Sequence, residues 1–112
     1  MMSKDLHKIE SAVLSIERIK RYTADMDYNS FANNDVVIDA VLMHFVNLGE
    51  KIGTISEGIR NEYPDIAYRK AKDMRNYIAH QYEGVDTINV WSTVTNIIPD
   101  LEKQLKQILD DQ

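Results

Sequence analysis

The sequence predicts an all-α fold, a four- to five-helix up-down bundle that forms a single domain over residues 1–112. The chain has only four glycines and two prolines, so it contains little turn material and few points at which a helix would break. Its apolar residues recur at three- and four-residue steps over long stretches, which is the spacing of one helix face. No Gly/Ser-rich or Pro-rich linker divides the chain, so no internal domain boundary is expected.

The first helix is expected to begin after Ser3, whose hydroxyl can accept a hydrogen bond from a free N–H of the first turn. One apolar stripe follows, at Leu6, Ile9, Val13, Ile16 and Ile19. The polar segment 25–34 then predicts a turn, in which Ser30 or Asn34 caps the next helix.

The second helix carries the most regular pattern in the chain. Its apolar residues alternate three- and four-residue steps, at Ile38, Val41, Phe45, Leu48, Ile52, Ile55 and Ile59. Such a heptad seam suits a nearly antiparallel bundle, and Pro64 ends the helix by disfavouring helical geometry at Tyr63. Five further apolar residues widen the stripe: Val36, Val37, Leu42, Met43 and Val46. This surplus predicts a homodimer interface, although a buried central helix would show the same pattern.

A shorter third helix is expected over residues 65–80, ended by Gly84 in the left-handed conformation that glycine tolerates. Asp86 then caps a fourth helix. Its predicted stripe is Ile88, Trp91, Val94, Ile98, Leu101, Leu105 and Ile108. Pro99 lies within this pattern and should kink the helix or divide it in two.

Composition limits the classes of function. Without cysteine the chain has no disulfide and no thiolate metal site or nucleophile, and it has no apolar stretch that could serve as a signal peptide or span a membrane. A cytoplasmic protein is therefore expected.

The net charge of −5 argues against a protein that coats nucleic acid by charge alone. Residues 66–82 nevertheless hold four basic side chains against Asp73, either as a solvated face or as a binding patch.

The segment from Arg75 to Tyr82 contains the materials for phosphodiester cleavage. Cleavage of RNA without a metal requires a base for the 2′-hydroxyl, a cation for the charged phosphorane and an acid for the leaving oxygen. His80 can serve as acid or base near neutral pH, and the planar guanidinium of Arg75 matches phosphate oxygens. Asn76 can orient either group without adding charge. The alternative is that His80 only pairs with the last carbonyls of its helix.

Helical geometry restricts how these residues can act together. At roughly 100° per residue, Arg75 and His80 lie roughly 140° apart on a straight helix, whereas Asn76 and His80 share a face. The helix must therefore end or distort before His80, or a second protomer must complete the site.

This segment resembles the R-x-x-x-x-H-x-Y signature of the HepT-like toxins in the HEPN superfamily, with Arg75, His80 and Tyr82 in the fixed positions and Asn76 also matching. Other segments resemble the family in the expected order, at residues 16–23, 47–53, 63–66, 84–86, 90–91 and 98–101. The sequence departs from the family at Ala67 and Tyr68, at Asp73 and at Gln81, without losing a motif residue.

The resemblance implies a dimeric, metal-independent endoribonuclease toxin that needs no cofactor. Its catalytic residues would be Arg75, Asn76 and His80, and its substrate would be RNA. The resemblance also implies a partner, an MntA-like nucleotidyltransferase antitoxin that transfers AMP from ATP to Tyr82 and silences the toxin. Glu50, in the segment that resembles the family's second helix, either orients the arginine or is simply solvated.

Two alternatives to the ribonuclease are a non-catalytic helical module that binds nucleotide or protein beside a nucleotidyltransferase, and a structural dimer whose motif has decayed. Net acidity and Asp73 favour the former over catalysis, whereas the intact motif favours catalysis. His7 and His44 lack ligand partners at metal spacing, and no metal site is expected. Phe45 and Trp91 are expected in the core.

Overall fold

Helices form all the regular structure that the computed structural model describes, over residues 3–112. The long helices are α1 (Lys4–Thr23), α3 (Asp35–Gly53), α5 (Tyr68–Gln81) and α7 (Ile98–Asp110). The shorter ones are α2 (Tyr28–Ala32), α4 (Glu57–Glu62) and α6 (Thr87–Ser92), with a 3₁₀ turn at Tyr82–Gly84 and a π turn at Thr93–Ile97. The predicted all-α fold is confirmed.

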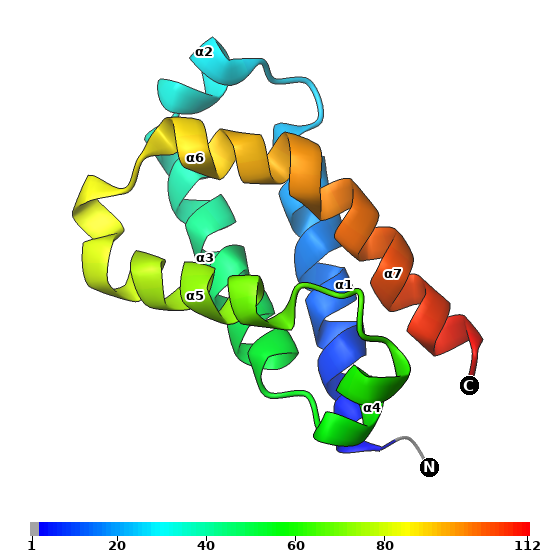
Figure 1. The fold of residues 1–112 in the computed structure, drawn as a ribbon. Helices are drawn as coiled ribbons and strands as arrows, with labels where there is room; N and C mark the ends of the chain where they lie inside the picture. The colour runs from blue at the N-terminus through cyan, green and yellow to red at the C-terminus, as the bar shows by residue number, and fades with distance from the viewer. Residues whose placement is uncertain (1–2) are drawn as a thin grey trace.

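The helices pack in the spatial order α5, α3, α1, α7 (Figure 1). Helix α3 lies at the centre, with α1 against one side and α5 across the other, while α7 packs along α1. Helix α6 caps the end of the bundle near α2 and continues through the π turn into α7. Helix α5 packs mainly on α3, so much of its surface faces solvent. None of the helices described between residues 3 and 112 is long and apolar enough to cross a membrane.

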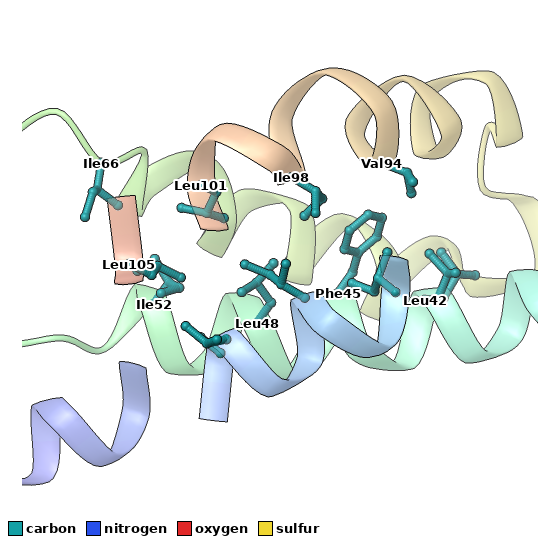
Figure 2. Close-up of a cluster of buried hydrophobic side chains, with 14 of the residues drawn as sticks. Leu42, Phe45, Leu48, Ile52, Ile66, Val94, Ile98, Leu101 and Leu105 are labelled. Atoms are coloured by element: carbon teal, nitrogen blue, oxygen red, sulfur yellow. The ribbon is translucent and has the colours of Figure 1, made fainter. Parts of the chain in front are cut away.

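The core forms where α3 faces α1 and the last helix. Figure 2 shows Phe45, Leu48 and Ile52 of α3 opposite Ile98 and Leu101. The predicted stripe of α1 is buried from Ile9 to Ile19, and that of the last helix from Val94 to Ile108. Each fully buried side chain of this size contributes roughly 1.5–3 kcal/mol relative to its exposed state. These interior faces are the ones that the sequence periodicity predicts.

Three predicted helix caps are confirmed. The side chains of Ser3, Asn34 and Asp86 each accept a hydrogen bond from a backbone N–H of the following first turn, at 3.2, 3.1 and 3.0 Å. The segment 25–34 is more than a turn, because α2 lies within it. There Asp27 accepts from the N–H of Ser30 at 2.8 Å while its own N–H donates to the Ser30 hydroxyl, so Ser30 closes a reciprocal capping box rather than capping α3.

The second helix is shorter than predicted, because α3 ends at Gly53 and a new helix, α4, begins at Glu57. Ser56 donates its backbone N–H to the carboxylate of Asp5 on α1 at 3.0 Å, and its hydroxyl donates to the same carboxylate. These bonds attach the connection between α3 and α4 to α1. Ile55 is fully buried all the same, so the apolar seam continues although the helix does not.

Two of the residues that widen the α3 stripe are the most exposed apolar side chains on that helix. Val36 is 79% and Met43 70% exposed, whereas Leu42 is buried and belongs to the core. Val37 and Val46 are half-buried against it. Of the five residues that widen the stripe, only Val36 and Met43 thus remain as exposed apolar surface, and they lie on the outer side of α3.

The third helix begins three residues later than predicted, at Tyr68, and runs through His80 to Gln81. It then tightens into the 3₁₀ turn that ends at Gly84. No glycine in the described part of the chain has a positive φ, so the left-handed stop predicted at Gly84 is wrong. A 3₁₀ turn satisfies the end of the helix in its place.

The fourth helix is interrupted next to Pro99, as predicted, by the π turn at Thr93–Ile97. The start of its predicted stripe is wrong: Ile88 is 64% exposed and Val90 is buried instead. The buried residues Val90, Val94 and Ile98 are spaced four residues apart. Because a π turn has more residues per turn than an α-helix, this spacing keeps the three side chains on one face.

Candidate functional site

Arg75 lies in the third turn of α5, on the side that turns toward α3. Its Nη2 and Nε atoms donate to Oε1 of Glu50, at 3.2 and 3.4 Å. Its Nη1 donates to Oδ1 of Asn76 at 3.2 Å. The Arg75 side chain is 37% and the Glu50 side chain 51% exposed, so the pair is accessible to a ligand from solvent. The two acceptors hold the guanidinium in one orientation without burying its charge.

Gly49 on α3 is what allows Arg75 this position. A Cβ at residue 49 would overlap the Cβ of Arg75 and would come within 2.5 Å of the carbonyl oxygen of Ala71. One turn later, a Cβ at Gly53 would lie 3.0 Å from the Cβ of Lys72. The backbones of α3 and α5 approach closely along this glycine line, and Glu50, beside Gly49, reaches the guanidinium.

His80 is exposed, and its side chain makes no hydrogen bond or ion pair with any other residue of the described segment 3–112. Of the two alternatives that helical geometry left open, an end or distortion of α5 before His80 is not found, because the helix remains α-helical through Gln81. Within one chain His80 therefore points roughly 140° away from Arg75 around the helix axis and shares a face with Asn76. The structure brings Arg75, Asn76 and Glu50 together and leaves His80 apart from the arginine.

Tyr82 is the first residue of the 3₁₀ turn, and it is 50% exposed. The nearby carboxylate of Asp39, on the outer side of α3, raises the pKa of the Tyr82 hydroxyl above the usual value. The hydroxyl is thus accessible and lies close to a carboxylate that the sequence interpretation did not include.

The C-terminal end of α5 is fixed to the next helix by Tyr77. Its hydroxyl accepts a hydrogen bond from the backbone N–H of Asp86 at 3.0 Å, and Asp86 in turn caps α6. This link limits how far His80 and Tyr82 can move relative to α6. The sequence interpretation gave Tyr77 no role.

His44 lies away from this site, on the side of α3 that contacts α1. Its Nδ1 atom is 3.1 Å from the hydroxyl of Ser15 on α1, and its ring packs beside Tyr22. Burial, followed by the nearby charge of Arg18, lowers the pKa of His44 below the usual histidine value. Phe45 is buried as predicted, and Trp91 packs partly buried against Phe31 with ring centroids 5.0 Å apart.

Fold and site define a small all-helical protein whose exposed helix presents an arginine, an asparagine and a histidine beside a paired carboxylate. The family model that describes ribonuclease HepT-like proteins matches residues 14–108. The chain therefore belongs to the ribonuclease HepT-like family, and the predicted family and its ribonuclease class are confirmed.

Several curated relatives match over nearly the full chain. A candidate RNase of Methanocaldococcus jannaschii is 35% identical over 99% of this chain and 97% of its own length. A second candidate RNase of that organism is 34% identical over 86% of this chain and 79% of its own length. A candidate ribonuclease HepT of Thermococcus cleftensis is 28% identical over 94% of this chain and 97% of its own length. The comparison with solved structures found no significant match.

Proposed function

We propose that the chain is a metal-independent endoribonuclease that acts in the cytoplasm as the toxin of a toxin–antitoxin pair. The observation that carries the proposal is the oriented guanidinium of Arg75, held by Glu50 and Asn76 on an open helix that also presents His80. A fixed, accessible guanidinium is suited to the negative charge that develops on a phosphorane.

The chemistry that these groups support is an internal transfer at phosphorus. A base takes the proton of the 2′-hydroxyl, and the 2′-oxygen attacks phosphorus as the bond to the 5′-oxygen breaks. An acid returns a proton to that leaving oxygen, and the products are a 2′,3′-cyclic phosphate and a 5′-hydroxyl. Imidazole can fill either proton-transfer role, while Arg75 binds the non-bridging oxygens and Asn76 orients the reacting groups.

A homodimer would supply the second histidine that this scheme needs. Within one protomer His80 lies on a different face of α5 from Arg75. The exposed side chains of Val36 and Met43 lie seven residues apart on α3, on the face that leads toward Glu50, and form apolar surface that a second protomer would cover. We propose that two protomers meet so that their motifs face each other.

The proposed reaction is tested by incubating single-stranded RNA with wild-type protein, His80→Ala and Arg75→Ala, each with and without EDTA. Wild type should cleave equally in both conditions, and both variants should be inactive. Because both side chains are partly or fully exposed, the melting temperatures should stay close to that of wild type. Inhibition by EDTA, or loss of activity together with a collapsed melting transition, would contradict the proposal.

The proposed dimer is tested by sedimentation, which should show a dimer at tens of micromolar. A monomer that is active would rule out the shared site.

The proposed regulation is transfer of AMP from ATP to Tyr82 by a nucleotidyltransferase antitoxin. The half-exposed Tyr82 hydroxyl can be reached by a second enzyme, and an AMP group there would place an anion and a base near the motif. Co-expression with the partner should add one AMP mass to the peptide that contains Tyr82. Tyr82→Phe should stay active and become insensitive to partner and ATP. An adduct on Tyr63 or Tyr77, or continued silencing of Tyr82→Phe, would refute this regulation without affecting the ribonuclease.

A second candidate function is a non-catalytic nucleotide- or protein-binding partner of a nucleotidyltransferase. It is favoured by Asp73, whose side chain is 64% exposed on the outside of α5 and adds negative charge two residues before Arg75. A chain of this kind would bind the partner with full affinity and leave RNA intact in the cleavage assay above.

A further inference from the structure

A basic hollow of about 780 Å³ lies on the outer side of α5, in the half that precedes the motif. We use the name "basic hollow" for the surface formed by Arg60 of α4 together with Arg69, Lys70, Lys72, Asp73 and Asn76 of α5. Four cations therefore surround one depression against a single carboxylate, on a chain whose net charge is −5.

Most of these cations are not neutralised within the chain. Arg69 lies 3.9 Å from Asp73, a contact at the long limit of ion pairing between two well-exposed side chains. Arg60, Lys70 and Lys72 have no ion-pair partner among residues 3–112, and all three are exposed. An incoming anion would meet free positive charge here without first displacing a carboxylate.

The fold itself assembles the hollow from two separate segments. The helix break at residues 54–56 turns α4 so that Arg60 lies over the start of α5. The Tyr68 hydroxyl donates to the carbonyl oxygen of Tyr63 at 2.7 Å, which ties the first turn of α5 to the end of α4. The close approach of Gly53 to Lys72 fixes the other wall. The fold thus fixes the backbone positions from which the cationic side chains extend around the hollow.

The basic hollow is continuous with the motif through Asn76. This residue lines the hollow, and its side chain accepts from Arg75 at 3.2 Å. Arg69, Asn76 and His80 point in similar directions around the axis of α5 and so share one face. Lys72 lies at the edge of that face, three residues after Arg69 and four before Asn76. At about 1.5 Å per residue, the track from residue 69 to residue 80 is roughly 16 Å long.

We propose that the basic hollow binds the backbone phosphates of the RNA strand on one side of the scissile bond. The inference rests on the proposed ribonuclease function and extends it to a substrate subsite. Phosphate contacts fix the register and orientation of a strand without reading its bases, so this subsite holds single-stranded RNA of any sequence in place. It also accounts for RNA binding by an acidic protein, because the local charge and not the net charge faces the strand.

The test compares two triple variants in the background of His80→Ala, which prevents cleavage during binding measurements. The first, Arg60→Gln/Arg69→Gln/Lys72→Gln, removes three charges from the basic hollow. The matched control, Lys4→Gln/Arg18→Gln/Lys103→Gln, removes three exposed charges from α1 and α7. Binding of a fluorescent single-stranded oligouridylate is followed by anisotropy over a range of salt concentrations, and circular dichroism melting checks the fold of each variant.

The hollow variant should bind RNA more weakly. The plot of log affinity against log salt concentration should become less steep by about 2, since each lost phosphate contact removes about 0.7 from the size of its negative slope. The control should keep the slope of the parent protein. With His80 restored, the hollow variant should show a raised KM and a kcat close to that of wild type. Equal losses in both variants, or an unchanged slope in the hollow variant, would overturn the inference.

The outcomes separate the inference from the function on which it rests. Cleavage by wild type with an unaltered KM in the hollow variant would refute the subsite and leave the ribonuclease standing. Binding that depends on the hollow without any cleavage by wild type would refute the ribonuclease and retain the phosphate subsite. A protein that neither binds nor cleaves RNA would refute both.

Discussion

Gly49 of α3 lies directly under Arg75 of α5, where any side chain on residue 49 would occupy the space of the arginine's own Cβ. The close packing of α3 on α5 at this point therefore sets the position of the charge that the proposed reaction needs. Since Glu50 follows Gly49, the same turn of α3 both admits the arginine and binds its guanidinium.

Gly49→Ala should therefore destabilise the fold and displace Arg75. Alanine normally favours a helix over glycine by up to about 1 kcal/mol, but overlap with α5 costs about 1–3 kcal/mol. Gly58→Ala is the matched control, because Gly58 is also helical but has space around it. The nearest atom to a Cβ at residue 58 would be the hydroxyl oxygen of Ser56, 4.0 Å away. Urea unfolding should show a loss for Gly49→Ala and a gain of about 0.4–1 kcal/mol for Gly58→Ala. Equal effects would mean that helix packing does not require a glycine at residue 49.

Glu50→Gln should loosen the hold on the Arg75 guanidinium while preserving the fold, because an amide oxygen still accepts a hydrogen bond but carries no charge. The pair is partly exposed, so the free energy of unfolding should fall by no more than about 1 kcal/mol. If Glu50 orients Arg75 for catalysis, kcat should fall, though less than in Arg75→Ala, and Glu50→Asp should recover part of the loss. An unchanged kcat together with a lower KM would instead identify Glu50 as a competitor of the RNA phosphate.

His44 should make the fold sensitive to mild acid. Burial and Arg18 lower the pKa of His44 in the folded state, so the unfolded chain binds the proton more readily. Stability should accordingly fall as the pH drops below about 6.5, the ordinary histidine value. Arg18→Gln should raise the His44 pKa in an NMR titration, and His44→Gln should flatten the acid limb of the stability curve between pH 7 and pH 5. An acid limb as steep in His44→Gln as in wild type would show that other groups cause it.

Glu102 should contribute stability that disappears at lower pH. It is nearly buried on α7, and its carboxylate lies 2.6 Å from Nζ of Lys20 and 3.3 Å from Nζ of Lys106. Burial alone would raise the pKa of Glu102, but the hydrogen bonds from the two lysines outweigh it, and the pKa lies below its usual value. The carboxylate therefore stabilises the fold above about pH 4.5, and this contribution is lost as the pH falls through its folded-state pKa.

Glu102→Gln tests this contribution with little change of shape. At pH 7 the variant should lose about 1–3 kcal/mol, the usual value of hydrogen bonds to a charged group. The difference from wild type should shrink as the pH is lowered from 4.5 to about 3. A difference that stays constant over this range would assign the effect to packing of the side chain and not to its charge.

Much of the fold could be predicted because apolar spacing and capping residues act locally. Ser3, Asn34 and Asp86 cap the helices they were expected to cap, since a side-chain acceptor needs only the next few residues. The break after Gly53 was not predicted, although Gly53 and Ser56 stand at the end of one helix and the start of the next; the contact that holds Ser56 comes from Asp5, 51 residues away in sequence. Likewise, Ile55 can be buried whether residues 54–56 form a helix or a turn, so the apolar periodicity alone could not distinguish the two.

The sequence proposed residues for the candidate site but not their geometry. Arg75, Asn76 and His80 were proposed from their chemistry and Tyr82 from the family resemblance. Two interpretations of Glu50 remained open until the structure placed it 3.2 Å from Arg75. Gly49 and Asp39 were missed as contributors. Two glycines four residues apart in an otherwise strongly helical segment were the available signal of a close helix contact. For Asp39 no local signal exists, because Tyr82 reaches it from another helix.

Helix α5 is covered chiefly on the side that faces α3, and this has a consequence for its dynamics. The α1–α3–α7 core holds most of the buried residues, so α5 can open while that core remains folded. Local opening of this kind has a lower free energy than global unfolding, and it permits earlier exchange of backbone amide protons with deuterium. The amides of residues 76–81 should thus exchange before those of residues 41–48. The helix that carries the motif has the fewest buried residues of the four long helices, and a bound strand or second protomer would slow its exchange selectively.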